Sequence, residues 1–252
     1  MKQALAMANI NLFAILRNLE DLCEMDAETR SIVKGKKMSI QFTVKGGPSA
    51  VFTVDDGKCA LRRGNESCDI KLYFTSPEHL NAMFDGSKNP IPLKGLTKLD
   101  FLKGDFIHLT KRLEYFLKPT DELLADPAYL KINTYLTVYT AGFALEQIGN
   151  YDSKGILNAS RIPDGVISLS ISGGLPAVML EAKKGVLTTS KGVAASARAY
   201  MTFSSLEVAN AILNGKMASY SAVGSGDFVV KGFLPMLDNM NKLLAQIPEY
   251  VS

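Results

Sequence analysis

The 252-residue chain has no tryptophan, two histidines and three cysteines. An odd cysteine count without the paired spacing of a metal site favours reduced thiols in a cytosolic protein over a disulfide framework. A disulfide between Cys59 and Cys68 is the alternative, which would leave Cys23 single. His79 and His108 have no cluster of cysteines or carboxylates around them in the sequence. These shortages argue against metal chemistry and against a Cys–His nucleophile.

A strong charge of one sign and long apolar runs are also missing. The 28 basic and 25 acidic residues leave a net charge of +3, which is too weak and too dispersed to predict nucleic-acid binding. A mild attraction to anionic membrane surfaces stays open. No stretch approaches the roughly 20 apolar residues that span a bilayer. Asn9 and Asn11 interrupt the apolar run at 4–16, so we expect no signal peptide and a cytoplasmic protein.

What the sequence does contain is a long internal repeat. Gly46 recurs as Gly173, 127 residues later, and Gly104 recurs as Gly232, 128 residues later. Solenoid repeats recur every 20–50 residues or so, whereas this period has the size of a compact domain. The sequence therefore predicts two copies of one domain.

Each copy shows the same order of expected elements. A helix leads each copy, at 5–22 and at 129–151, and strands, a hairpin, a serine-capped helix, a last strand and a closing helix follow. In the first copy we expect the last strand at 99–103. The predicted domains are residues 1–120 and 121–252.

This order, found twice, resembles the sterol carrier protein type two family (SCP2-like). The resemblance implies an α+β protein of two tandem SCP2-like domains, each a mostly antiparallel five-stranded sheet backed by helices. It also implies a hydrophobic tunnel between sheet and helices for sterols, fatty acyl chains or isoprenoids. The segments that carry the resemblance are 51–57, Gly64, 68–72, 80–86 and 101–105 in the first copy, and Gly185, Gly192, 199–215 and 226–232 in the second.

The residues expected to line the two tunnels are apolar and lie on the strand and helix faces that would point inward. Methionine suits a cavity that accepts varied apolar guests, although plain core packing would use the same residue types. The candidate ligand-binding residues are Phe42, Phe52, Leu72, Phe74, Leu80, Met83, Phe84, Phe101, Phe106 and Leu109 in the first copy, and Leu169, Met179, Met201, Phe203, Leu213, Phe228, Met236 and Leu237 in the second.

The two cavities are expected to differ in preference. The repeat aligns Phe52 with Met179 and Phe84 with Leu213. Aromatic rings are rigid, while Met and Leu adapt, so we expect the second cavity to accept the more varied guest.

Two functions of different classes are compatible with these patterns. The resemblance implies a non-catalytic lipid-binding or lipid-transport protein that carries an apolar ligand and contacts membrane surfaces transiently. The alternative is a structural or interaction protein with filled cores, an accessory partner of a lipid- or quinone-modifying enzyme. We find no catalytic constellation, so hydrolase or transferase activity ranks below both. Gly173 and Gly226 lack the context of a phosphate-binding loop, so we expect no cofactor.

Overall fold

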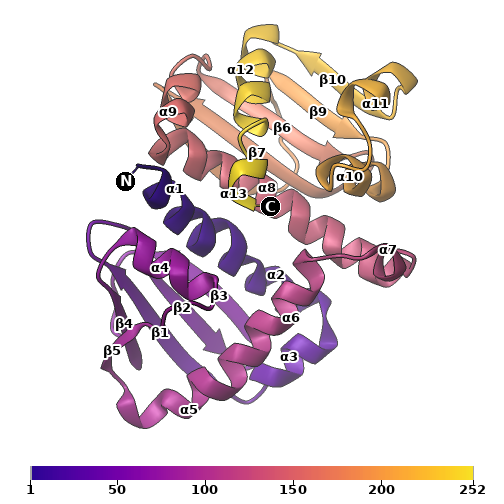
Figure 1. Ribbon diagram of the computed structural model, residues 1–252. Helices are drawn as coiled ribbons and strands as arrows, with labels where there is room; N and C mark the ends of the chain where they lie inside the picture. The colour runs from indigo at the N-terminus through magenta and orange to yellow at the C-terminus, as the bar shows by residue number, and fades with distance from the viewer. Residues whose placement is uncertain (1, 252) are drawn as a thin grey trace. The chain divides into compact units, whose positions relative to one another are not determined.

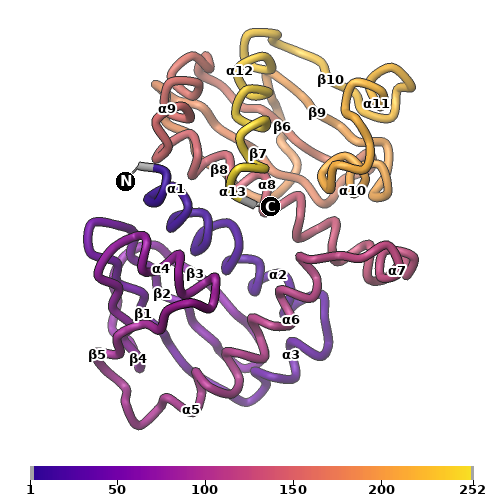
Figure 2. The backbone as a smooth tube through the Cα atoms, in the orientation of Figure 1, coloured from indigo at the N-terminus to yellow at the C-terminus, as the bar shows by residue number. Residues whose placement is uncertain are grey.

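The computed structural model describes residues 2–251 and divides into two compact units (Figures 1 and 2). Unit 1 ends at Lys118 and unit 2 begins at Pro119. Each unit holds one five-stranded sheet with helices packed on it, so the α+β class is confirmed.

Unit 1 begins with a helical segment that changes its winding three times before the first strand. Its elements are α1 (Lys2–Ile10), the π-helix η1 (Asn11–Ile15), the 3-10 helix η2 (Leu16–Asn18), α2 (Leu19–Met25), α3 (Ala27–Val33), β1 (Lys37–Val44), β2 (Ser49–Asp55), β3 (Lys58–Arg63), β4 (Ile70–Phe74), α4 (Pro77–Phe84), β5 (Ile91–Lys94), the 3-10 helix η3 (Leu96–Lys98), α5 (Leu99–Phe101), the π-helix η4 (Leu102–Phe106) and α6 (Ile107–Leu117).

Unit 2 follows the same course with one added helix before its last strand. Its elements are α7 (Asp121–Leu124), α8 (Pro127–Tyr151), α9 (Ser153–Ala159), β6 (Gly165–Ile171), β7 (Gly174–Lys183), β8 (Val186–Lys191), β9 (Ala199–Phe203), α10 (Leu206–Leu213), the added α11 (Ser219–Ser225), β10 (Phe228–Gly232), α12 (Leu234–Leu244) and α13 (Pro248–Val251).

The two sheets have the same strand order and the same strand directions. The orders are β3-β2-β1-β4-β5 and β8-β7-β6-β9-β10. The expectation of mostly antiparallel sheets is partly wrong, because β1 pairs in parallel with β4 and β6 pairs in parallel with β9. Both sheets are therefore mixed.

A crossover connection at 64–69 produces the parallel pair in unit 1. It carries the chain back from the end of β3 to the start of β4, across the sheet face that bears Gln41. The Gln41 amide donates to the carbonyl of Gly64 at 3.2 Å and accepts from the N–H of Glu66 at 3.1 Å. These bonds satisfy a buried amide and hold the connection against the sheet.

Helices cover the opposite face of this sheet (Figure 1). Alternation along β1 places Ile40, Phe42 and Val44 on it, and all three are buried. Register pairs Ile40 with Phe52 on β2 and with Ile70 on β4, so one continuous apolar face crosses the three strands.

The expected last strand at 99–103 is wrong. That segment is helical, and the strand that pairs with β4 is β5, which Gly95 ends with a φ of +83°. A Cβ on Gly95 would meet the backbone of Asp69, as a Cβ on Gly232 would meet the backbone of Arg198. Gly95, and not Gly104, therefore corresponds to Gly232. The sequence separation between these two glycines exceeds the repeat length because unit 2 contains the added helix α11.

A glutamate protects one edge strand in each unit. Glu20 on α2 accepts a hydrogen bond from the N–H of Leu61 on β3 at 2.7 Å. Glu146 on α8 accepts one from the N–H of Thr189 on β8 at 2.8 Å. Because an edge strand presents unpaired donors, each carboxylate blocks a point where another strand could pair.

Candidate functional site

Four phenylalanines meet between the sheet and the helices of unit 1. Phe42 on β1 lies parallel to Phe74 on β4, with ring centroids 6.3 Å apart. Phe106 on η4 lies 6.3 Å from Phe42 and 5.6 Å from Phe52 on β2, tilted against both rings. Offset and edge-on ring pairs at these distances are favourable beyond their buried area. We call these four residues the aromatic cluster.

Phe106 differs from the other three rings in its exposure and its backbone. Phe42, Phe52 and Phe74 are almost fully buried, whereas Phe106 is half-buried and reaches solvent. It ends a π-helical turn, a conformation that is rare and is found disproportionately at functional sites. An ion pair between Lys36 and Asp105, at 2.6 Å, anchors this turn to the start of the sheet. Phe106 is thus the outer cover of the aromatic cluster.

The other candidates of unit 1 divide by burial. Leu72, Leu80 and Leu109 are buried, and Phe101 is nearly so, although it lies on α5 and not on the expected strand. Met83 and Phe84 lie in the last turn of α4 and are half-buried.

Unit 2 places most of its candidates in the corresponding apolar layer. Phe203 on β9 and Phe228 on β10 stack with ring centroids 4.6 Å apart. Leu213 ends α10 and is half-buried. The remaining buried candidates are Leu169 and Met201 on strands, and Met236 and Leu237 on α12.

Met179 is the exception, because its side chain lies on the other face of the sheet. Register pairs Ile167 with Leu180 in unit 2, as it pairs Ile40 with Phe52 in unit 1. Leu180 therefore takes the place of Phe52, and the sequence alignment of Phe52 with Met179 is wrong by one residue. A slip of one residue moves a strand side chain to the opposite face.

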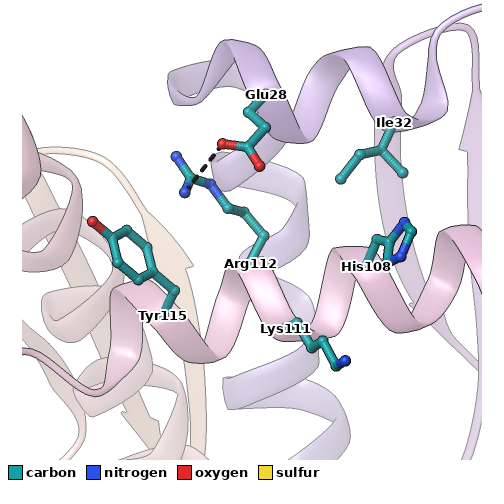
Figure 3. Close-up of a pocket in the computed structure, with 6 residues that line it drawn as sticks. All are labelled: Glu28, Ile32, His108, Lys111, Arg112 and Tyr115. Atoms are coloured by element: carbon teal, nitrogen blue, oxygen red, sulfur yellow. Dashed lines mark ion pairs between the residues drawn. The ribbon is translucent and has the colours of Figure 1, made fainter.

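A pocket that the sequence did not indicate lies between α3 and α6 (Figure 3). Its volume is about 440 Å³, and none of the candidate ligand-binding residues lines it. The residues around it are Glu28, Ile32, His108, Lys111, Arg112 and Tyr115.

An ion-pair network occupies one side of this pocket. Arg112 donates two hydrogen bonds to the carboxylate of Asp26, at 2.9 and 3.0 Å, and pairs with Glu28 at 3.2 Å. Asp26 also caps α3 by accepting from the N–H and hydroxyl of Thr29. Burial alone would raise the pKa of Asp26, but the hydrogen bonds from Arg112 and Thr29 outweigh it and lower the pKa to about 2. The network joins α3 to α6, and two carboxylates already neutralise Arg112.

The edge of the sheet in unit 1 carries exposed apolar side chains. Leu93 on β5 is 57% exposed and Leu96 on η3 is 65% exposed. Exposed lysines, Lys88 and Lys103, lie on the flanking segments. This edge of unit 1 thus carries both exposed apolar and exposed basic side chains.

Within residues 2–251, no group of three or more His, Cys, Asp or Glu side chains could hold a metal ion. Over the same residues, every helix is too short or too polar to cross a bilayer.

Comparison with known proteins gives likenesses only among solved structures. No family profile matches the chain, and no curated protein matches it. A sterol carrier protein domain of Helicoverpa armigera aligns with 44% of this chain and 87% of its own, at 18% identity and a TM-score of 0.35. A ubiquinone synthesis protein, UbiJ-SCP2, aligns with 44% of this chain and 94% of its own, at 14% identity and a TM-score of 0.34.

A third similar structure is an enzyme. The inverting sec-alkylsulfatase Pisa1 of Pseudomonas sp. aligns with 59% of this chain and 28% of its own, at 16% identity and a TM-score of 0.25. The two sterol-carrier alignments each cover less than half of this chain.

Proposed function

We propose that the protein is a non-catalytic carrier of an apolar, lipid-like molecule, which it holds between the sheet and the helices. It would act in the cytoplasm, whose thiol reductants return cysteines to the reduced state. The observation that carries the proposal is Phe106, a half-buried ring on a π-helical turn that covers an otherwise buried aromatic cluster.

The proposed entry step is an outward turn of Phe106. Its ring contacts Phe42 and Phe52. A phenyl ring makes no hydrogen bond that would hold it, so only van der Waals contact opposes its movement. An acyl, sterol or isoprenoid chain could then lie against the same apolar face, with the turned Phe106 ring in contact with it as its outer cover. Burial of apolar ligand surface would supply the binding free energy, at roughly 25 cal/mol per Å².

The two units are proposed to be tandem SCP2-like domains. Identical strand order, identical strand directions and the matching contacts of Glu20 and Glu146 support a common origin. Unit 2 has Phe203 and Phe228 in its apolar layer. We therefore propose a second site for an apolar ligand there, lined by different residues from those of the aromatic cluster in unit 1.

Ligand uptake by the full chain tests the proposal. Native mass spectrometry of gently purified protein should show adducts of lipid mass, and fluorescent fatty acids should be taken up. If no adduct and no uptake is found, the protein is better described as an interaction protein with filled cores, an accessory partner of a lipid- or quinone-modifying enzyme.

A pair of variants separates binding from folding. Phe106→Ala removes a ring that would contact the ligand and should weaken fatty-acid binding about tenfold, the equivalent of about 1.4 kcal/mol. Phe116→Ala is the matched control, because Phe116 is a buried phenylalanine of α6 that packs against Tyr115 and Arg112, outside the aromatic cluster. Equal weakening in both variants would indicate general loss of structure.

We also propose transient contact with anionic membranes through Leu93 and Leu96. Replacing both with serine should reduce co-sedimentation with phosphatidylcholine–phosphatidylserine vesicles. The same change at Leu234, which is 74% exposed in unit 2, is the control. Binding that is equal with and without phosphatidylserine, or unaffected by the two serines, would contradict this contact.

A further inference from the structure

Two cysteines that lie far apart in the sequence meet in unit 1. The Sγ atoms of Cys23 on α2 and Cys59 on β3 are 3.1 Å apart, in hydrogen-bonding contact. Cys23 is 1% exposed and Cys59 is 8% exposed. Cys68, the partner considered from the sequence, is also a free thiol and lies just before β4. The structure therefore selects Cys23 as the neighbour of Cys59.

Several contacts hold the two thiols in place. Register pairs Cys59 with Val54, which puts its side chain on the sheet face that lies under the helices. Glu20, one turn before Cys23, binds the backbone of Leu61, two residues after Cys59. α2 and β3 are thus fixed to each other beside the thiol pair.

Unit 2 shows that packing at this place does not require thiols. Glu146 and Thr189 correspond to Glu20 and Leu61, so Gly149 stands where Cys23 stands and Leu187 stands where Cys59 stands. A Cβ on Gly149 would contact the side chain of Leu187. There a glycine and a leucine fill the space between helix and edge strand.

We propose that Cys23 and Cys59 are a modification site, which a peroxide oxidises to a reversible disulfide. The Cys23 thiol loses its proton, the thiolate attacks a peroxide oxygen, and the O–O bond breaks. The leaving hydroxide takes up that proton, so the products are a sulfenic acid on Cys23 and one water. The Cys59 sulfur then attacks the Cys23 sulfur, the S–O bond breaks, and a second water leaves with the Cys59 proton. Two thiols and one hydrogen peroxide thus give one disulfide and two waters, and a dithiol reverses the change.

The electrostatic surroundings assign the order of these steps. The hydrogen bond with Cys59 lowers the pKa of Cys23, and the Arg30 guanidinium adds to this effect, against the opposing effect of burial. Arg30 is held there because its Nε donates to the Cys23 carbonyl at 2.9 Å. The same thiol contact, together with burial, raises the pKa of Cys59. Cys23 is accordingly the attacking sulfur and Cys59 the resolving one.

The disulfide would tie the leading helix to an edge strand. It would close a loop of 36 residues between α2 and β3, which restricts the unfolded chain and stabilises the fold. This inference does not depend on the proposed lipid-carrier function, because it concerns bond formation and stability alone.

Peptide mapping of the full-length protein tests the site directly. Reduced protein is treated with hydrogen peroxide, its remaining thiols are alkylated under denaturing conditions, and the digest is analysed without reduction. We expect one linked peptide that joins Cys23 to Cys59, with Cys68 alkylated. Alkylation of all three cysteines, a link to Cys68, or a link between two molecules would each overturn the proposal.

Melting temperatures give a second, independent readout. The oxidised protein should melt about 5 °C or more above the reduced protein, and dithiothreitol should remove the difference. Cys23→Ser should abolish the shift, whereas Cys68→Ser, at a similarly buried cysteine, should keep it. If Cys23→Ser does not fold, peptide mapping of the peroxide-treated wild-type protein still shows whether Cys23 and Cys59 form a disulfide. A shift that persists in folded Cys23→Ser protein would contradict the assignment.

Discussion

Asn210 donates a hydrogen bond from its side-chain amide to Oδ1 of Asn133, at 2.6 Å, between α10 and α8. Both residues are buried. Unit 1 has a similar pair, in which Asn11 on η1 donates to Asn81 on α4 at 3.1 Å. In both units an asparagine pair therefore joins the leading helix to the serine-capped helix.

Asn210→Ala should destabilise the protein by about 1–3 kcal/mol, because it removes bonds to Asn133 and to Thr134 inside a buried layer. Urea unfolding measures the change. Asn214→Ala is the graded control, because Asn214 is only half-buried and its bonds are longer, at 3.1 and 3.5 Å. A larger loss at Asn214 than at Asn210 would contradict the importance of the buried pair.

Because of the Asp26–Arg112 pair, the free energy of unfolding should decrease at acidic pH. The pKa of Asp26 is lowered to about 2 in the folded protein, below its value in the unfolded chain. The pair's contribution is therefore complete above the unfolded pKa and is lost as the pH falls through the folded pKa. After allowance for solvent screening, we expect a loss of about 1–2 kcal/mol between roughly pH 5 and pH 2.

Substitution of the arginine isolates this pH dependence. Arg112→Met should lower the stability at neutral pH and flatten its decline in acid, as measured by urea unfolding at several pH values. Lys118→Met removes an exposed ion pair with Glu114 on the same helix and should leave the acid dependence unchanged. If Arg112→Met retained the full acid-dependent loss, another carboxylate would be responsible.

Gly95→Ala should cost about 1–3 kcal/mol in unfolding free energy. Gly95 has a φ of +83°, and an added Cβ would lie 2.5 Å from the carbonyl oxygen of Asp69. Gly46→Ala is the control, because Gly46 has a φ of +69° but open space around it. Thermal or urea unfolding of both variants separates the steric cost from the conformational cost, and equal losses would show that the contact with Asp69 adds nothing.

The register of β7 predicts opposite outcomes at neighbouring positions. Leu180→Phe adds volume to the packed layer and should destabilise the protein by about 1–3 kcal/mol. Met179→Phe, on the half-buried outer face, should change stability by about 0.5 kcal/mol or less. The reverse ranking in urea unfolding would mean that Met179, and not Leu180, faces the helices.

Local patterns in the sequence were enough to predict most strands and the helix that begins after Ser76. They rest on alternation, turn glycines and serine caps, which act over a few residues. In unit 2 two serines precede α10, and the side chain that caps the helix is that of Ser205, which accepts from the N–H of Val208.

The errors concern features that the local pattern does not determine. The apolar residues at 99–103 fit a strand or a helix equally well, and only the pairing of β5 with β4 decides between them. Met179 and Leu180 are both apolar, so only the register with Ile167 tells which one points inward. The pairs Cys23–Cys59 and Asp26–Arg112 join segments that are far apart in the sequence, and no local sequence pattern predicts either contact.

The strand order also bears on how the chain folds as it is synthesised. All five strands of the first sheet precede residue 95, and all five of the second follow residue 164, so neither sheet borrows a strand from the other. The first sheet can therefore close while the ribosome is still making α8, which follows the general order of domain folding during translation. Within each sheet the parallel pair joins strands that are not consecutive along the chain, because Ile40 pairs with Ile70 and Ile167 pairs with Ala199. Closing these long-range pairs should set the folding rate of each unit.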